Sequence, residues 1–385
     1  MRIVNLCLGG PVVDGWNYQD NLLPKYQKKN GHDVIVIASK WVWNSEGRLE
    51  IFDKSDYFNE DGVKMIRLDL QKGQKVTSKF KKYRGVYETL EKCEPDVLFV
   101  HGVSYRDVKT AAKYLKNHPN VIGYADNHAD FSNSAANWFS KYILHKIIWR
   151  HYAQMLIPHI KKFYGVLPGR VDFLIDMYHL PKDKCELLVM GADDEKVEKS
   201  KNIVSREQLR QEYGINKDDF LIVTGGKIDQ WKIQTLDLMQ AVREIDDDSV
   251  KLIVFGSVIP ELSSRVKKIS DGKLVQYIGW IEADSSYEYF AAADLVCFPG
   301  RHSVFWEQVV GQGIPMICKD WSGTHHVDLG GNVIFLKEAG VAEIRNTIEY
   351  LLENQGEYKK MKKIAEEKGM KNFSYKDIAR RSITL

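Results

Sequence analysis

Short apolar runs, each ending at a glycine or a turn, recur along the second half of the chain. They lie at 220–224, 252–255, 275–278 and 295–298, and segments with apolar residues at helical spacing separate them. Continuous apolar runs without alternation are typical of strands that are buried on both faces of a parallel sheet. The pattern therefore predicts a doubly wound α/β domain in this half.

The segment 295–317 contains the clearest strand–helix–strand step. Its first run stops at Pro299-Gly300, apolar residues at 304–310 follow helical spacing, and Gly313 precedes the next run. Ser303 stands just before this helix, where its side chain could cap the free N–H groups. Ligands of open parallel sheets bind at the carboxyl ends of the strands, and helix N-termini attract anions, so we expect an anion site near Ser303. An ordinary strand–helix–strand unit without a ligand fits the same pattern.

The first half repeats this organisation. Strand-like runs at 3–8, 34–38, 62–68, 96–100 and 121–124 predict a second parallel sheet. The loop after the first run contains Gly9 and Gly10, but it does not fit the G-x-G-x-x-G pattern, and no acidic residue ends the second run. A dinucleotide-dependent dehydrogenase is therefore disfavoured.

Polar side chains follow two neighbouring strands of this first predicted sheet. His101 comes directly after one strand, and Asp126, Asn127 and His128 follow the next. Successive strand ends are where open α/β sheets place their sites, so we expect these residues to border one crevice. A purely structural role for either histidine also fits.

The segment 137–166 has the pattern of a long helix that Pro158 divides into two. Tryptophans and other apolar residues alternate there with Lys141, Lys146 and Arg150. Such an amphipathic helix suits a membrane interface or a lipid-linked substrate. A helix that packs against the protein core gives the same pattern.

The polar stretch from Gly191 to Asn216 lacks strand signals, and we place the domain linker there. The predicted domains are therefore 1–192 and 193–366, followed by a closing helical segment at 367–385. A chain of 385 residues suits two domains of this size.

Composition narrows the function classes. A net charge of +3 is too mild to indicate nucleic-acid binding, and five scattered cysteines without Cys-x-x-Cys spacing indicate neither disulfides nor a zinc site. No signal-peptide pattern and no membrane-spanning stretch is evident, so we expect a cytoplasmic protein. The run Asp246-Asp247-Asp248 reads as a solvated turn and not as a metal site.

Several motifs of the second half, taken in order, resemble one known family. They are Gly225-Gly226-Lys227 with Lys232, Val254-Phe255-Gly256, Tyr277-Ile278-Gly279-Trp280, Ala293-Asp294-Leu295-Val296 and the segment from Pro299 to Pro315. Together they resemble the nucleotide-sugar domain of retaining GT-B glycosyltransferases of family 4 (group 1), which are common in bacterial polysaccharide assembly. The first half is compatible, so the resemblance covers nearly the whole chain. It implies two Rossmann-like domains that face a central cleft.

The resemblance also implies site residues. Lys227, which stands where arginine is usual, and Lys232 match the family's basic pair on the donor diphosphate. With His128 beside the transferred sugar, they form the expected catalytic set. The donor-binding residues that it implies are Gly9, Gly10, Gly226, Tyr277, Ile278, Arg301, His302, Ser303, Val304, Glu307 and Gln308, and the acceptor-binding residues are Gly15, Trp16, His101, Asp126 and Asn127.

The chain departs from the family at its E-x7-E motif. Counting back from Pro315 puts Gln308 at the place of the second glutamate, which binds the donor ribose, and Gly300 at the place of the first. Glu307 lies one residue before the expected position, so the ribose ligand is either Glu307 or Gln308. The carboxylate that normally lies near the donor sugar is missing.

These observations predict a retaining glycosyltransferase that moves a sugar from a nucleoside diphosphate sugar, with UDP favoured over GDP, to a glycan or lipid-linked glycan of a surface polysaccharide such as a capsule. His128 is then a hydrogen-bond partner of a sugar hydroxyl or a proton acceptor. No strand-borne Asp-x-Asp motif appears, so neither a metal nor another cofactor is expected. Peripheral contact with the anionic inner face of the membrane is possible. A nucleotide-sugar epimerase or hydrolase of the same fold and a non-catalytic partner subunit remain as alternatives.

Overall fold

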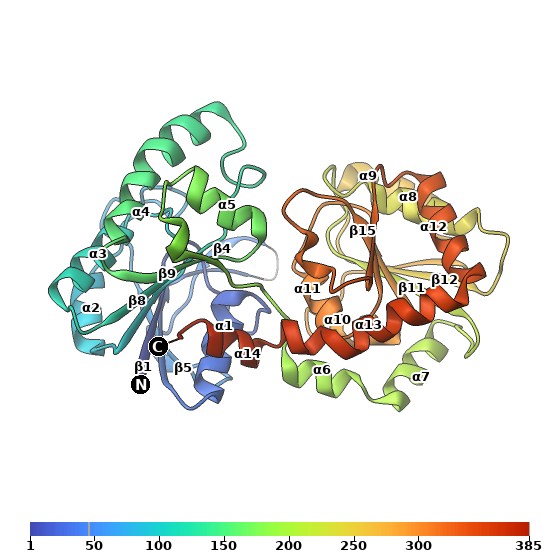
Figure 1. Ribbon diagram of the computed structural model, residues 1–385, viewed down its shortest axis with the longest axis horizontal. Helices are drawn as coiled ribbons and strands as arrows, with labels where there is room; N and C mark the ends of the chain where they lie inside the picture. Colours follow the sequence, from blue (N-terminus) through green and yellow to red (C-terminus); the bar gives the residue numbers. More distant parts are fainter. Residues whose placement is uncertain (45–46, 385) are drawn as a thin grey trace. The chain divides into compact units, whose positions relative to one another are not determined.

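The computed structural model describes residues 1–44 and 47–384, which form two compact units (Figure 1). Unit 1 comprises Met1–Val189 and Tyr375–Leu385, and unit 2 comprises Met190–Ser374. The chain returns to unit 1 at Tyr375 and not at the predicted 367, because helix α13 (Gln355–Phe373) continues unbroken to the end of unit 2.

Unit 1 is an open α/β sheet with an antiparallel edge. Its strands are β1 (Arg2–Cys7), β2 (Asp33–Ser39), β5 (Asp56–Phe58), β6 (Lys64–Leu68), β7 (Val97–Val100), β8 (Ile122–Asn127), β9 (Ile160–Gly165) and β10 (Cys185–Leu187), and a separate hairpin joins β3 (Trp41–Trp43) to β4 (Leu49–Ile51). The sheet order is β10-β9-β8-β7-β1-β2-β6-β5, and only β5 runs antiparallel to its neighbour. The helices are α1 (Gln19–Lys29), α2 (Val86–Cys93), α3 (Val108–Asn117), the π-helical η1 (Ser140–Trp149), α4 (Arg150–Leu156), α5 (Pro168–Asp176), the 3₁₀ turn η2 (Lys182–Lys184) and α14 (Tyr375–Arg381).

The apolar strands of unit 1 are buried between helices. Side chains of α2, α3, η1, α4 and α5 form one continuous core with β1, β7 and β9. Helix α14 lies beside α1, where the rings of Tyr26 and Tyr375 stack with centroids 6.4 Å apart (Figure 1). The closing segment of the chain is therefore part of unit 1.

The helix predicted over 137–166 is wrong beyond Leu156. Helix α4 ends there, and residues 160–165 form β9, which pairs parallel with β8 and β10. The backbone at Gly165 passes so close to α5 that an added Cβ would lie 2.3 Å from the nitrogen of Val171. Pairing with two neighbouring strands thus overrides the local helical pattern.

Unit 2 contains a fully parallel six-stranded sheet. Its strands are β11 (Phe220–Gly225), β12 (Val250–Phe255), β13 (Val275–Gly279), β14 (Leu295–Phe298), β15 (Met316–Lys319) and β16 (Val333–Leu336). They follow the order β13-β12-β11-β14-β15-β16. Its helices are α6 (Asp194–Ser200), α7 (Ile203–Glu212), α8 (Gln234–Arg243), α9 (Pro260–Ile269), α10 (Ser286–Ala292), α11 (Phe305–Gly311), the 3₁₀ turn η3 (His325–Val327), α12 (Val341–Glu353) and α13.

Helices cover both faces of this sheet. Helices α8, α9 and α12 lie on one face, and α10, α11 and α13 lie on the other (Figure 1). The interpretation of 191–216 as a linker is wrong for the later part of this stretch. That part forms α6 and α7, which pack on α10 within unit 2. Asp193 caps α6 by accepting hydrogen bonds from the backbone N–H groups of Glu195 and Lys196.

Candidate functional site

The strand order of unit 2 defines where a ligand fits. β11 is the first strand of this unit. In the sheet, β12 and β13 lie on one side of β11, and β14, β15 and β16 lie on the other. The loops that leave β11 and β14 therefore diverge in opposite directions above the sheet, which is the switch point where doubly wound sheets bind ligands. Gly226 and Lys227 follow β11, and Gly300 and Arg301 follow β14. The structure thus brings Gly300 and three predicted site residues, Gly226, Lys227 and Arg301, to one edge.

Two glycines allow the loops at this edge to pass very close to each other. Gly256, which follows β12, has φ +121°, and an added Cβ there would lie 2.1 Å from the carbonyl oxygen of Gly226. A Cβ at Gly225 would lie 2.1 Å from the ring of Phe255. Only glycine tolerates this geometry, so the position of the Gly226 loop depends on both residues.

Gly256→Ala should therefore displace the Gly226 loop. Backbone strain at a positive φ together with the contact on the carbonyl of Gly226 predicts a loss of about 1–3 kcal/mol in the free energy of unfolding and weaker binding of an anionic ligand. Urea unfolding and nucleotide titration measure the two effects. Gly272→Ala is the matched control, because it also has a positive φ but no atom within 4 Å of the added Cβ. Equal losses in both variants would show that strain alone acts.

Lys232 lies between the two loops. It occupies the turn before α8, its Nζ lies 3.3 Å from the position of a Cβ at Gly226, and a Cβ at Gly300 would touch its Cα at 3.0 Å. Burial is the main influence that lowers the pKa of Lys232, Asp229 raises it, and the charge of Arg301 lowers it further. A half-buried ammonium group with a second cation nearby suits a bound anion.

The other two cations of this edge are more open. Lys227 is exposed, and Arg301 is half-buried and lies over the ring of Trp231, 5.1 Å from its centroid. With Lys232 they form a cationic group around Gly226 and Gly300. This group has the charge and the donors to hold a phosphate or diphosphate.

Tyr277 and Ile278 end β13 on the same edge. The hydroxyl of Tyr277 donates a 2.8 Å hydrogen bond to the carbonyl of Gly256, and both residues are half-buried. Tyr277 therefore supports the loop that packs on Gly226, in addition to any contact with a nucleotide base.

Ser303 does not cap α11, and that expectation is wrong. The helix begins at Phe305, its N-cap residue is Val304, and no side chain caps it. The hydroxyl of Ser303 is buried and has no hydrogen-bond partner among the described residues.

The structure reveals a cluster of His302, Glu307 and His326 that the sequence did not. Glu307 is 0% exposed, and its Oε1 lies 2.9 Å from Nε2 of His302 and 2.8 Å from Nε2 of His326. Burial raises the pKa of Glu307, but the two histidines outweigh it and lower the pKa to about 2. Glu307 is thus paired through Oε1 inside unit 2, and ribose binding by this carboxylate stays a prediction.

Gln308 is also buried. Its side-chain amide donates hydrogen bonds to the hydroxyl of Ser286 at 3.0 Å and to the side chain of Gln312 at 3.3 Å. It ties α11 to α10, so ribose contact by its amide nitrogen would require that this nitrogen leave these partners.

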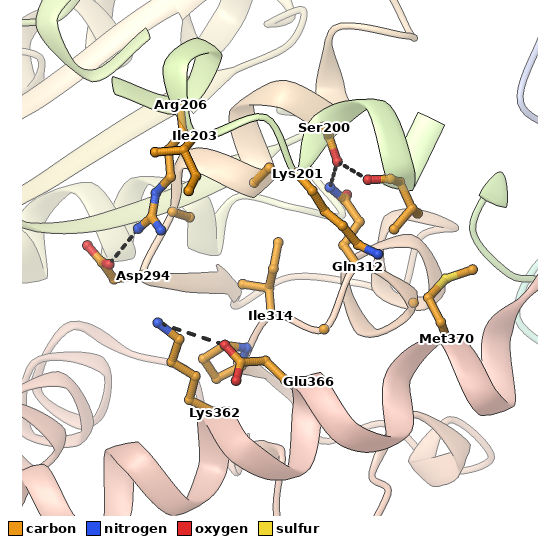
Figure 2. Close-up of a pocket in the computed structure, with 16 residues that line it drawn as sticks. Ser200, Lys201, Ile203, Arg206, Asp294, Gln312, Ile314, Lys362, Glu366 and Met370 are labelled. Atoms are coloured by element: carbon orange, nitrogen blue, oxygen red, sulfur yellow. Dashed lines mark hydrogen bonds and ion pairs between the residues drawn. The ribbon is translucent and has the colours of Figure 1, made fainter. Parts of the chain in front are cut away.

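A separate cavity of about 360 Å³ lies at the amino ends of β14 and β15, on the opposite edge from the Gly226 loop. Figure 2 shows two ion pairs in its wall, one between Arg206 and Asp294 and one between Lys362 and Glu366. Its charged groups thus partly neutralise each other, and nothing in the sequence indicated this cavity.

Asp126 is the centre of a buried polar network in unit 1. This side chain is 0% exposed, and its oxygens accept hydrogen bonds from the backbone N–H of Gly102 at 2.7 Å and from the side chain of Gln19 at 3.1 Å. Its Oδ2 also lies 3.0 Å from Nδ1 of His101 and 3.3 Å from Nε2 of His128. The predicted strand-end residues do lie together, and this one carboxylate connects them.

The two histidines of this network differ in exposure. Burial is the largest influence on His101 and lowers its pKa, but Cys7 and Asp126 raise it more, so that the net pKa lies well above the ordinary value. Its Nε2 lies 3.0 Å from Oδ1 of Asn5. The side chain of His128 is 38% exposed and is the member of the network that can meet a ligand.

Three of the predicted acceptor-binding side chains are buried and have partners within unit 1, and their direct contact with an acceptor stays a prediction. His101 and Asp126 are committed to the network. The amide of Asn127 donates to the carbonyl groups of Ala129 and Arg170, and its Oδ1 accepts from the backbone of Ala129. These groups position the loop that carries His128.

Arg67 anchors the glycine loop that follows β1. This buried guanidinium donates to the carbonyls of Val12 and Ser39 and pairs with Asp14 at 2.9 Å. Gly9, Gly10, Gly15 and Trp16 lie exposed on this loop. The structure thus places these predicted residues on one anchored loop at the carboxyl end of β1.

Three groups in the described residues bring three potential metal-binding atoms within 4.8 Å of one another. They are His302, Glu307 and His326; His101, Asp126 and His128; and Cys7, Asp20 and His101. In the first two groups the histidine nitrogens face a carboxylate, so hydrogen bonds and ion pairs already account for their arrangement.

The chain is similar to known proteins both in part of its sequence and in its fold. Residues 205–368, most of unit 2, match the family model of glycosyl transferases group 1. None of the curated proteins matches the chain.

Solved structures match over nearly the full length. A glycosyltransferase from Rickettsia africae has a TM-score of 0.70 at 15% identity, covering 99% of this chain and 96% of its own. Anabaena Alr3699/HepE, solved with UDP, has a TM-score of 0.70 at 14% identity, with coverages of 99% and 98%. WaaG, a glycosyltransferase involved in lipopolysaccharide biosynthesis, has a TM-score of 0.65 at 14% identity, with coverages of 99% and 100%.

The chain therefore has the GT-B fold, as the resemblance predicted. Within this fold, residues 205–368 are similar to the group 1 glycosyl transferases. Among the described residues, no helix is both long and apolar enough to cross a bilayer.

Proposed function

We propose that this protein is a retaining glycosyltransferase that transfers a sugar from a nucleoside diphosphate sugar to a glycan or lipid-linked glycan. The observation that carries the proposal is the group of Lys232, Lys227 and Arg301 around two glycine loops at the switch point of a group 1 domain. UDP is the proposed carrier, since Alr3699/HepE was solved with UDP and with UDP-glucose. Retention is what the family resemblance implies.

The proposed chemistry needs positive charge at the leaving group. Breaking the bond between the anomeric carbon and the diphosphate builds negative charge on the departing oxygen, and preorganised cations stabilise that charge in the transition state. Lys232 and Lys227 supply it, so no metal or other cofactor is proposed. In a front-face reaction the leaving phosphate takes the proton of the acceptor hydroxyl, and His128 then orients a hydroxyl of the transferred sugar.

An acceptor-dependence assay tests this function against its alternatives. Release of UDP from UDP-sugars should require a glycan acceptor, and NMR of the product should show the anomeric configuration of the donor. Release of UDP without any acceptor would favour a hydrolase or epimerase. Binding of UDP without turnover of any sugar would favour a non-catalytic subunit.

We also propose that unit 1 meets an anionic membrane that carries the acceptor. On and beside η1, Trp138, Phe139, Tyr142 and Ile147 are exposed, and Trp138 is 68% exposed. Lys146 lies over the ring of Tyr142. Aromatic side chains beside lysines are typical of a surface that enters the headgroup region of a bilayer.

A basic groove supports the same proposal. A cavity of about 660 Å³ beside α3 and α4 is lined by Lys82, Arg106, Lys109, Lys113, Lys116 and His159, and none of the described residues that line it is acidic. Clustered cations of this kind attract anionic headgroups over about a Debye length. Arg150, which we expected on this surface, instead donates to the carbonyl of Met177 at 2.7 Å.

Replacing Lys141 and Lys146 together by glutamine should weaken binding to phosphatidylglycerol vesicles by tenfold or more, because each lysine near such a surface contributes about 1 kcal/mol. Vesicle sedimentation at two salt concentrations measures the effect. Lys359→Gln with Lys363→Gln, on α13, is the control pair. If the η1 pair binds the vesicles as wild type does, this surface is not the membrane contact.

A further inference from the structure

Lys81 places an ammonium group at the glycine loop that follows β1. It belongs to the lysine-rich segment 71–84, between β6 and α2, and its Nζ donates a 3.1 Å hydrogen bond to the carbonyl of Gly9. Gly9 lies at the carboxyl end of β1, on the edge of the sheet where open α/β proteins bind ligands. The donor and acceptor residues named so far do not include this lysine.

The charge of Lys81 has no counter-charge among residues 1–44 and 47–384. Its side chain is half-buried, and no described carboxylate lies within ion-pair distance of Nζ. Burial lowers the pKa of Lys81. The carbonyl of Gly9 takes one of its three N–H groups, and Gly10, the next residue of the loop, has no atom within 4 Å of an added Cβ. A partly desolvated ammonium group beside open space therefore suits an anionic ligand.

The loop that Lys81 contacts packs on the loop that belongs to the His128 network. A Cβ on Gly9 would lie 3.7 Å from the carbonyl oxygen of His101. The next backbone N–H after His101 donates a hydrogen bond to Asp126, whose carboxylate also pairs with His128. Lys81 and the exposed histidine of the network therefore belong to the same edge of unit 1.

Two further cations extend the positive charge away from this edge. Lys82 follows Lys81, Arg106 stands in the loop after β7 on which Gly9 packs, and both line the basic groove. The nearby carboxylate of Asp107 is buried and accepts hydrogen bonds from a backbone N–H and from a threonine hydroxyl. It forms no ion pair with either cation among the described residues. An anion that approaches the glycine loop therefore meets positive charge.

We propose that the acceptor is an acidic glycan, and that Lys81 binds a carboxylate of a sugar next to the one that accepts the transferred residue. The inference rests on the proposed glycosyltransferase function and names its class of acceptor. A single ammonium group matches the single charge of a uronate, and the resulting hydrogen bond is charge-assisted. Complementary charge also selects acidic over neutral glycans.

Calorimetric binding of glycans to the full chain, with and without UDP, tests the proposal. The probes are tetrasaccharides that contain glucuronate or galacturonate, and each is compared with its carboxyl-reduced counterpart, which keeps the sugars and linkages but lacks the charge. Wild type should bind at least one acidic probe about tenfold more tightly than its reduced counterpart. Lys81→Gln should lose this preference and retain its affinity for UDP and for the neutral probe.

Two further variants separate binding of a charge from support of the loop. Lys81→Arg keeps the positive charge and should keep most of the preference for the acidic probe. Lys75→Gln is the matched control, because it removes an exposed lysine from the same segment. It should behave as wild type. Circular dichroism confirms that each variant is folded.

The failures are distinguishable. If no acidic probe binds wild type more tightly than its reduced counterpart, or if Lys81→Gln keeps the wild-type preference, this inference is overturned. It is also overturned if Lys81→Gln weakens both probes of a pair equally, which indicates loop support, or weakens only UDP or phosphatidylglycerol vesicles, which indicates a donor or headgroup contact. If wild type binds no nucleoside diphosphate but prefers acidic probes through Lys81, the proposed function fails and the glycan site stands.

Discussion

Lys232→Ala should lower turnover by about 10²–10³-fold and leave the protein folded. Removal of one preorganised charge from a site where negative charge develops typically has this effect. Nζ of Lys232 lies at the Gly226 loop, and its Cα, Cβ and Cγ pack against Gly300, so its charge is held between the two loops. Turnover of the donor with acceptor present, at saturating donor, measures the loss.

The matched control for this variant is Lys359→Ala, which removes an exposed lysine from α13 of the same unit. It should leave turnover unchanged. Lys232→Arg should retain part of the activity because the charge remains. Near-normal turnover of a folded Lys232→Ala variant would refute the phosphate role of this lysine.

Asp126→Asn should destabilise unit 1 by about 3–5 kcal/mol, because it leaves the buried imidazolium of His101 without its counter-charge. It also weakens the acceptor for the N–H of Gly102 and frees His128. Urea unfolding at neutral pH measures the loss. Asp33→Asn, a mostly exposed carboxylate in the same unit, is the control and should cost less than about 1 kcal/mol.

The pH dependence of this stability has two limbs. The pKa of Asp126 is lowered in the folded protein, mainly by His101 and His128 against the effect of burial. Its contribution is therefore present above its unfolded pKa of about 4 and is lost as pH falls. The pKa of His101 is raised, so its contribution is present below about 6.5 and is lost as pH rises through the folded value. If the free energy of unfolding of Asp126→Asn depends on pH as that of wild type does, the pairing of Asp126 with His101 is contradicted.

Much of the fold could be predicted because local pattern and tertiary environment agree. Each of the apolar runs in the second half became a strand of one parallel sheet, and the loops after 225 and 298 meet at its switch point. The error at β9 arose because the local pattern and the tertiary environment disagree there. Residues 160–165 carry a helical spacing, but their aromatic side chains are buried and their backbone pairs with two strands.

The site was predictable only as far as chain position determines it. Gly226, Lys232 and Gly300 could be placed from the strands that precede them. The contact between Glu307 and His326 could not be predicted, because His326 lies 19 residues further along, on a turn that folds back onto α11. The burial of Asp126 could not be predicted either, since four groups from three separate parts of the chain surround its carboxylate.

The most direct test of the central claim is a thermal-shift panel of UDP, GDP, ADP, CMP and NAD on the full chain, without added metal. Binding to the folded state alone raises the unfolding temperature. We expect a clear shift with one nucleoside diphosphate, UDP first, and its loss in Lys232→Ala. No shift with any of these compounds would contradict a donor site at the Gly226 loop and would make a non-catalytic role the leading account.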